Sequence, residues 1–174
     1  MFRNAFSGLP DVNYEWLGSS EDCNYDLLMY VGSAIPGKSL GVDQILRTYS
    51  SMRDEHPTAK LRIVAGRLPY EQELIEEVIA RIQDDDYVRM ENIEDLDTAL
   101  EMVMDARVIL TTDTYFSHLA GATGKPTYTI FVKTNGLIWR PDNQPLSHVF
   151  QSQLPMECSE MKVDGTCSEF YGSC

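Results

Sequence analysis

Two spacings of apolar residues alternate along the middle of the chain. Short runs of strand length are separated by longer stretches in which apolar residues recur every three or four positions. The short runs predict five β-strands, at residues 25–31, 61–65, 87–90, 107–111 and 127–132. The longer stretches predict four helices, at residues 42–55, 70–83, 93–105 and 114–122.

Strands that alternate with helices in this way are typical of βαβ units, whose strands lie parallel. The run Val108-Ile109-Leu110 is apolar at every position, as expected of a parallel strand that is buried on both faces. We therefore predict an α/β fold, a single Rossmann-like domain with a doubly wound parallel sheet. It should occupy residues 23–132, after a lead-in segment at 1–22. Residues 133–174 should form a loop with at most one or two short helices and an irregular, Cys-rich tail.

The charge balance disfavours binding to nucleic acid. The chain carries 14 Lys and Arg against 27 Asp and Glu, a net charge of −13, which repels phosphate over most of the surface. Its longest apolar stretches fall far short of the ~20 residues that cross a bilayer, and the first residues lack the apolar core of a signal peptide. We expect a cytoplasmic protein without a transmembrane segment.

Three of the four cysteines, Cys158, Cys167 and Cys174, lie near the C-terminal end. Their spacing is not the C-x2-C pattern of a zinc site, and no metal site is predicted. Free intracellular thiols are the simplest interpretation. A disulfide within the tail and a loose metal site are the alternatives.

The loop after the first strand carries a basic residue suited to phosphate. Ligands of open α/β sheets bind beyond the carboxyl ends of the strands, and Lys38 lies in such a loop, within the sequence G-S-A-I-P-G-K-S. This sequence also matches the P-loop pattern through Gly32, Gly37, Lys38 and Ser39, so a P-loop NTPase or phosphotransferase is an alternative function. Pro36 weakens that alternative because it removes an amide donor from the loop. An ordinary strand-to-helix turn is the third interpretation.

Acidic residues follow the second strand. Glu71 and Glu73 are candidates to bind ribose hydroxyls, as acidic residues do in dinucleotide sites. The alternative is a carboxylate that only favours the positive end of a helix dipole.

The loop after the fourth strand is the most informative. Asp113 or Thr114 should cap the helix that follows, whose first amides would form an anion site at the carboxyl edge of the sheet. Ser117 and His118 lie within the first turn or so of that helix and complete the set of candidate binding residues. An imidazole there can donate to phosphate or sugar oxygens, although a lone histidine is also common as a structural residue.

These residues, with those that follow them, resemble a known family. The resemblance rests on Asp113-Thr114, His118-Leu119-Ala120, Gly124-Lys125-Pro126-Thr127, Ile130-Phe131 and Trp139-Arg140-Pro141. In this order the motifs are similar to the C-terminal, nucleotide-sugar-binding half of the ADP-heptose:lipopolysaccharide heptosyltransferases (glycosyltransferase family 9). A weaker resemblance extends over about residues 25–141. Two departures stand out: Tyr115 replaces the family's glycine after Asp-Thr, and Val132-Lys133 replaces a Gly-Pro.

The resemblance implies half of a GT-B fold and inverting, metal-independent sugar transfer from a nucleotide-diphosphate donor, without a cofactor. It implies that Asp113, Thr114 and His118 surround the diphosphate and sugar, and that Lys38 neutralises the charge of the leaving group. It places the ribose near Glu71 and the base near the segment Asn92-Ile93.

The catalytic base of the resembled family lies in the other half of the enzyme, so no catalytic residue is assigned here. A complete GT-B enzyme needs about 300 residues in two domains, more than one core of this size holds. We expect the transferase to be incomplete without an acceptor-binding domain, which leaves a fragment, a subunit of a split enzyme or a stand-alone module as possibilities. The alternative within the same fold is a non-catalytic module that binds nucleotide sugars.

Overall fold

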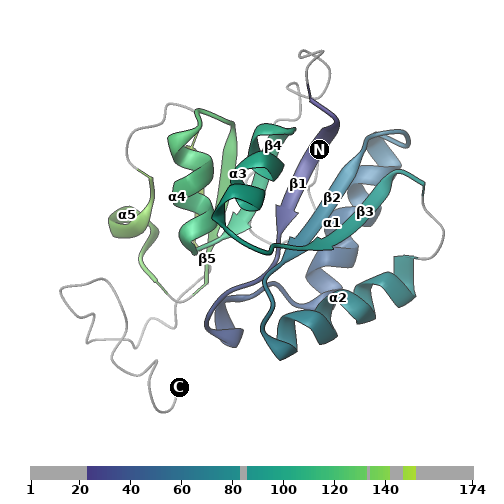
Figure 1. Cartoon of the computed structure of the whole chain (residues 1–174), viewed down its shortest axis with the longest axis horizontal. Coiled ribbons are helices and arrows are strands. Elements are labelled where there is room, and N and C mark those ends of the chain that lie inside the picture. Colours follow the sequence, from purple (N-terminus) through teal and green to yellow (C-terminus); the bar gives the residue numbers. More distant parts are fainter. Residues whose placement is uncertain (1–22, 83–85, 133, 142–146, 152–174) are drawn as a thin grey trace.

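The computed structural model describes residues 23–82, 86–132, 134–141 and 147–151. Its centre is a six-stranded, all-parallel sheet in the order β3-β2-β1-β4-β5-β6 (Figure 1). The strands are β1 (Tyr25–Tyr30), β2 (Leu61–Ala65), β3 (Val88–Asn92), β4 (Ala106–Thr112), β5 (Thr127–Phe131) and β6 (Ser147–Gln151). The helices are α1 (Val42–Glu55), α2 (Pro69–Ile82), α3 (Leu96–Met104), α4 (Tyr115–Ala122), α5 (Gly136–Trp139) and the short 3-10 helix η1 (Pro36–Lys38).

Both faces of the sheet are covered by helices, which confirms the predicted doubly wound α/β fold. In β1, Leu27 and Met29 point into the core with α1 and α2, whereas Leu28 and Tyr30 point into the core with α3 and α4. Successive side chains of a strand face opposite sides, so the apolar run Leu27–Tyr30 of β1 supplies both cores. Each large apolar side chain that is fully buried in this way stabilises the fold by about 1.5–3 kcal/mol.

All five predicted strands and all four predicted helices are present, with small shifts at their ends. The largest shift is at α3, which begins at Leu96 and not at Ile93. The side chain of Asp95 accepts a hydrogen bond of 2.8 Å from the backbone N–H of Thr98 and so fixes the start of the helix. Ile93 remains in the core as a buried loop residue.

The sixth strand, β6, was not expected from the sequence. It pairs in parallel with β5 along Thr127–Phe131 and lies at the edge of the sheet. Only Phe150 of its five residues is buried. This strand mixes polar and apolar residues and lacks a continuous apolar run such as Leu27–Tyr30 of β1 or Val108–Leu110 of β4.

The connections of the sheet determine where a ligand can bind. From β1 the chain moves outward through β2 to β3, and then returns to the other side of β1 to add β4, β5 and β6. The direction of winding therefore changes between β1 and β4. In open α/β sheets the crevice at such a switch point, beyond the carboxyl ends of the strands, is the usual ligand site.

No helix within the described ranges is both long enough and apolar enough to cross a membrane.

Candidate functional site

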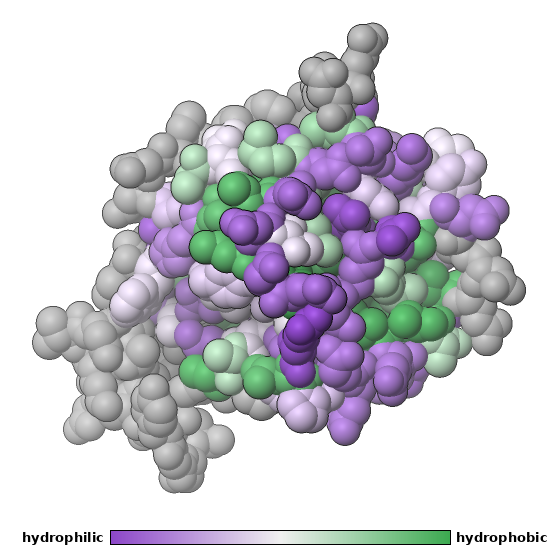
Figure 2. Space-filling view, viewed as in Figure 1, coloured by the Kyte–Doolittle hydropathy of each residue, from purple (hydrophilic) through white to green (hydrophobic). Residues whose placement is uncertain are grey.

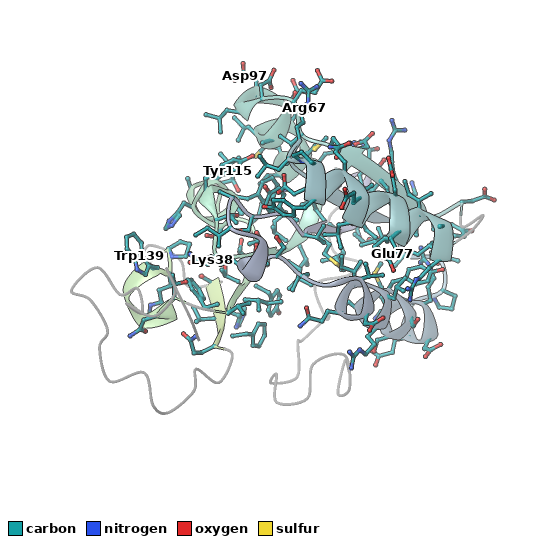
Figure 3. All side chains as sticks on the ribbon, turned by 90° about the horizontal axis from the view of Figure 1, so that it is seen from below. Lys38, Arg67, Glu77, Asp97, Tyr115 and Trp139 are labelled. Atoms are coloured by element: carbon teal, nitrogen blue, oxygen red, sulfur yellow. The ribbon has the colours of Figure 1, made fainter. Side chains whose placement is uncertain are left out.

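A pocket of about 590 Å³ opens at this switch point. Figure 3 shows Lys38, Tyr115 and Arg67 among the side chains at this edge of the sheet. The pocket is lined by Tyr30 at the end of β1 and by residues of the loops that follow β1, β2, β3 and β4. These loops contribute residues 33–35, 38, 66–68, 71, 93–96 and 113–115 to the lining. We call this the carboxyl-edge pocket.

An ion pair joins the loops that follow β1 and β4. The Lys38 Nζ atom lies 2.8 Å from Asp113 Oδ2, and the two side chains are only 14% and 10% exposed. The hydroxyl of Thr134 donates a hydrogen bond to the same carboxylate oxygen. The backbone N–H of Asp113 donates to the carbonyl of Ile130 at 3.2 Å and anchors the loop on β5. An ammonium has three N–H donors, so Lys38 keeps donors for a ligand while Asp113 orients it.

The start of α4 supplies further donors to the same pocket. Thr114 is the N-cap residue, and its hydroxyl accepts a hydrogen bond of 3.2 Å from the backbone N–H of Phe116. Within the described part of the chain, the backbone N–H groups of Thr114 and Tyr115 have no acceptor. Free amides at the positive end of a helix dipole are a favourable site for an anion.

A buried carboxylate forms the floor of the pocket. Glu71 is only 2% exposed, and its Oε2 atom accepts a hydrogen bond of 3.0 Å from the backbone N–H of Leu68. A Cβ atom on Gly32 or on Gly66 would press directly on this carboxylate. The two glycines therefore make room for the Glu71 side chain between the loops that follow β1 and β2.

The negative charge of Glu71 contributes to raised pKa values of the phenols around it. The pKa of Tyr30 is raised far above its usual value, first because the phenol is buried and second because of the nearby negative charge of Glu71. The pKa values of Tyr70 and Tyr115 are raised for the same two reasons, in the same order. These three hydroxyls are therefore neutral at physiological pH and able to donate hydrogen bonds.

The structure brings Lys38, Glu71, Asp113 and Thr114 together in the carboxyl-edge pocket, out of the six residues proposed from the sequence. Ser117 is fully buried and does not line it. The Ser117 hydroxyl donates to the carbonyl of Thr114 at 2.8 Å and stabilises the first turn of α4. His118 is exposed on α4, outside the lining, and Glu73 is exposed on α2.

Sequence reasoning missed several residues of the site. Thr134 contacts Asp113 although it lies 21 positions away along the chain, and no sequence pattern connects the two. Tyr30 was expected only as a core residue of a strand. Leu68 and Leu96 are exposed apolar residues at the pocket, each next to a helix start. Their exposure is a property of the folded surface and leaves no signal in the sequence.

The geometry of Lys38 differs from that of a P-loop. In a P-loop the Gly-Lys-Ser/Thr sequence leads directly into the helix. Here α1 begins at Val42 with Gly41 as its N-cap residue, so Lys38 and Ser39 lie before the helix. The Lys38 ammonium is held by Asp113 across the crevice. The match to the P-loop pattern is therefore not accompanied by the P-loop arrangement.

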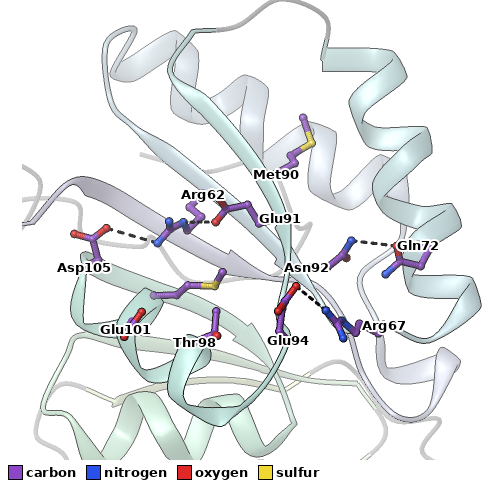
Figure 4. Close-up of a pocket in the computed structure, with 11 residues that line it drawn as sticks. Arg62, Arg67, Gln72, Met90, Glu91, Asn92, Glu94, Thr98, Glu101 and Asp105 are labelled. Atoms are coloured by element: carbon purple, nitrogen blue, oxygen red, sulfur yellow. Dashed lines mark hydrogen bonds and ion pairs between the residues drawn. The ribbon is translucent and has the colours of Figure 1, made fainter.

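A second, larger hollow of about 1000 Å³ lies on the face of the sheet, between α3 and the strands β2 and β3 (Figure 4). We call it the sheet-face hollow. Arg62 pairs there with Glu91 at 3.0 Å and with Asp105 at 3.6 Å. The amide of Asn92 donates to the side-chain oxygen of Gln72 at 3.0 Å. In Figure 2 hydrophilic residues cover the middle of this side of the molecule.

The open parallel sheet, with a pocket at its switch point, defines a Rossmann-like α/β domain. The family model of glycosyltransferase family 9 (heptosyltransferase) matches residues 59–167, which is more than half of the chain. The chain therefore belongs to glycosyltransferase family 9.

Solved structures with the same fold include members of this family. Escherichia coli heptosyltransferase WaaC, solved with ADP, matches with a TM-score of 0.65 and 15% identity over 86% of this chain and 41% of that chain. E. coli ADP-heptose lps heptosyltransferase II matches with a TM-score of 0.62 and 16% identity over 88% of this chain and 43% of that one. A glycosyl transferase family 9 protein from Veillonella parvula matches with a TM-score of 0.57 and 17% identity, over 74% and 36%.

The chain thus spans about two fifths of the length of the solved heptosyltransferases that it matches. This extent is consistent with half of a two-domain fold. No curated protein matches the chain in sequence.

Proposed function

We propose that this chain binds a nucleotide-diphosphate sugar in the carboxyl-edge pocket and forms the donor-binding half of a glycosyltransferase. One observation carries the proposal: the Lys38 ammonium and the free amides of Thr114 and Tyr115 meet in one pocket at the switch point of the sheet. A volume of about 590 Å³ is in the range of small-molecule sites.

The diphosphate would bind between Lys38 and the start of α4. Its negative charges accept hydrogen bonds from the two free amides and from the remaining donors of the ammonium. Attraction at this point matters because the chain as a whole carries a net charge of −13 and repels anions elsewhere. The Asp113 carboxylate has no hydrogen-bond donor for a phosphate and carries the same sign of charge, so it is suited instead to accept hydrogen bonds from the hydroxyl groups of the donor sugar.

The nucleoside would extend from the diphosphate towards the loops that follow β2 and β3. Glu71 lies on this path, and a carboxylate accepts hydrogen bonds from ribose hydroxyls. The loop that contains Ile93 also lines the pocket, and Ile93 would offer an apolar surface to the base. The order of loops therefore matches the order of the groups in a nucleotide sugar.

The same geometry suits sugar transfer without a metal. When the bond between the sugar and the diphosphate breaks, negative charge develops on the leaving diphosphate. A preorganised ammonium and two backbone amides would stabilise this charge without further rearrangement. His118, exposed on α4 one turn after Thr114, would approach the sugar from outside the pocket. The acceptor hydroxyl and the base that removes its proton would come from an acceptor-binding half, which gives an inverting transfer.

Thermal unfolding in the presence of candidate donors tests this function. ATP, ADP, UDP, GDP and the sugar conjugates of the diphosphates are each added in EDTA and in Mg²⁺. A ligand at 100 times its Kd should stabilise the protein by about 2.7 kcal/mol. We expect one sugar nucleotide to raise the melting temperature equally well in EDTA. Stabilisation by ATP only in the presence of Mg²⁺, or no stabilisation by any of these ligands, would contradict the proposal.

A further inference from the structure

The first residue of α4 is a tyrosine at the position where the resembled family has glycine. Tyr115 lines the carboxyl-edge pocket, and its side chain is 49% exposed. A glycine there lets a ligand approach the backbone closely, whereas a phenol adds a large flat surface to the wall of the pocket. The substitution therefore changes the shape and the chemistry of the site in this chain.

Buried aromatic residues hold the Tyr115 ring in place. Tyr30 and Phe116 stack with their ring centroids 4.6 Å apart, and both are buried. The Tyr115 centroid lies 6.1 Å from each of them, with its plane turned by 70° and 76°. In such edge-to-face contacts a ring that is perpendicular to its neighbours keeps at least one face uncovered by them. Tyr115 is thus held by contacts with Tyr30 and Phe116 and still has a ring face that is free to contact a ligand.

Other exposed apolar side chains continue this surface. Leu96 is 60% exposed and Leu68 is 42% exposed, and both line the same pocket. Leu96 is the first residue of α3 and Tyr115 the first residue of α4, and these neighbouring helices begin at the same edge of the sheet. Large apolar side chains that gather at one opening and remain exposed indicate a surface that a ligand covers.

We propose that Tyr115 is the surface on which the base of the bound nucleotide stacks. This inference rests on the proposed function and names a residue that determines how the donor is held. Lys38, the proposed phosphate-binding cation, lines the same pocket as Tyr115, and so do Ile93 and Leu96 from the loop that follows β3. In Figure 3 Tyr115 lies between Lys38 and Arg67, on the path from the phosphate groups to the outer loops.

Stacking explains why an aromatic residue suits this position. The face of any base packs on an aromatic ring, and such stacking contributes affinity without reading the hydrogen-bonding edge of the base. The polar edge would instead meet Arg67, Glu94 and Asp95, which line the same pocket. Tyr115 therefore makes affinity depend on the presence of a base, and the neighbouring polar residues govern which base is preferred.

The test compares a ligand that has a base with one that lacks it. Calorimetric titrations measure ADP and inorganic pyrophosphate binding to the wild-type chain and to the Tyr115→Ala, Tyr115→Gly and Tyr115→Phe variants. We expect Tyr115→Ala and Tyr115→Gly to weaken ADP about tenfold or more and to leave pyrophosphate unchanged. Tyr115→Phe keeps the ring and should bind ADP like the wild type.

Three results would overturn the inference. ADP affinity that is unchanged in Tyr115→Ala would show that the ring does not contact the base. An equal loss for ADP and pyrophosphate would show a general effect on the phosphate site. Failure of Tyr115→Phe to retain ADP binding would show that the hydroxyl, and not the ring, is required. Melting temperatures of the variants establish that each is folded.

The same titrations separate this inference from the proposed function. If the wild-type chain binds neither ADP nor any other nucleoside diphosphate, the proposed function fails and the role of Tyr115 fails with it. If the wild type binds ADP and Tyr115→Ala binds it equally well, only the role of Tyr115 fails.

Discussion

The sheet-face hollow and the carboxyl-edge pocket differ in a way that their sizes do not reveal. The sheet-face hollow is the larger, at about 1000 Å³, against about 590 Å³ for the carboxyl-edge pocket. In the larger hollow the Arg62 guanidinium forms ion pairs with Glu91 and Asp105, and its Cζ atom lies 4.3 Å from the ring centroid of Tyr25. In the smaller pocket, free helix-start amides and exposed apolar side chains meet at the switch point of the sheet.

The two hollows differ in whether their charged and polar groups are already paired with other groups of the protein when no ligand is bound. Paired charges such as those of Arg62 hold β2, β3 and the end of α3 together. Groups that keep unused donors, such as Lys38 and the amide of Thr114, can bind a further anion. We therefore propose that the sheet-face hollow is a structural feature and that a ligand binds in the carboxyl-edge pocket.

Removal of the phosphate-binding cation should have the largest effect on this comparison. Lys38→Ala deletes the ammonium that faces the proposed diphosphate, and charge-assisted hydrogen bonds are among the strongest polar contacts. We expect nucleoside diphosphate affinity to fall about 100-fold, which corresponds to about 2.7 kcal/mol. Calorimetric titration measures the change.

Lys60→Ala is the matched control. Lys60 is an exposed lysine just before β2, at the opposite edge of the sheet. The same change of charge there should leave affinity within about twofold, because exposed charges at this distance are screened. Equal losses in the two variants would mean that only net charge matters and that the pocket does not bind the anion.

Displacement of the pocket floor should have the next largest effect. In Gly66→Ala the new methyl group meets the Glu71 carboxylate and pushes it from its buried position. We expect about tenfold weaker nucleotide binding, the equivalent of one or two hydrogen bonds, measured by the same titration. In Gly41→Ala the nearest atom, Oε1 of Gln44, lies 3.6 Å from the new methyl group, an ordinary contact. A nucleotide affinity of Gly66→Ala equal to that of Gly41→Ala would remove Glu71 from the site.

Disruption of the sheet-face hollow should change stability and leave binding intact. Arg62→Met removes the cation that Glu91 and Asp105 share and leaves Glu91 with only the exposed Arg89 as a partner. The loss of such a partly buried partner should cost about 1–3 kcal/mol of unfolding free energy. Urea titration measures this cost. Arg81→Met is the control, because Arg81 forms an exposed pair with Glu77 on α2 that contributes about 0.5 kcal/mol or less. Weakened nucleotide binding in Arg62→Met would contradict our division between the two hollows.

The smallest effect concerns the cap of α3 at the rim of the pocket. The pKa of Asp95 is lowered, chiefly because its carboxylate accepts a hydrogen bond from the backbone N–H of Thr98. A lowered pKa in the folded state stabilises the fold above the ordinary pKa of the residue, and this contribution is lost as pH falls through the folded value. Asp95→Ala should therefore melt below the wild type at pH 7, and the gap should narrow below about pH 4.

Asp95→Asn separates the cap from its charge. Asparagine is also a favourable N-cap residue, so at pH 7 this variant should melt between the wild type and Asp95→Ala. The difference in melting temperature between Asp95→Asn and Asp95→Ala should not narrow at low pH. A gap between wild type and Asp95→Ala that stays constant from pH 7 to pH 3 would show that the charge of Asp95 plays no part.

The sequence was sufficient for most of the fold because local pattern and burial agree in this chain. Strands β1, β2, β4 and β5 are mainly apolar, and their parallel orientation follows from the helices between them. The edge strand β6 lacks that pattern, and its pairing with β5 depends on tertiary contacts that no local window contains. The start of α3 shifted because the cap at Asp95 outweighed the apolar spacing that includes Ile93.

The site was predictable where it follows from chain order and unpredictable where it follows from packing. Lys38, Asp113 and Thr114 each come after a strand, and the carboxyl ends of parallel strands share an edge, so their proximity could be expected. The burial of Ser117 could not, because it depends on which face of α4 packs on the sheet. Thr134 reaches Asp113 only through the path of the chain after β5.

Hydrogen exchange with and without a nucleoside diphosphate tests whether the nucleotide binds in the carboxyl-edge pocket, because it locates the bound ligand on the chain. We expect slower amide exchange in residues 33–38 and 113–117, with a smaller effect in 66–71 and 93–96. No change is expected in residues 86–91 and 98–105, which form the sheet-face hollow and its surroundings. Protection confined to residues 86–91 and 98–105 would place the nucleotide in the sheet-face hollow and would contradict binding in the carboxyl-edge pocket.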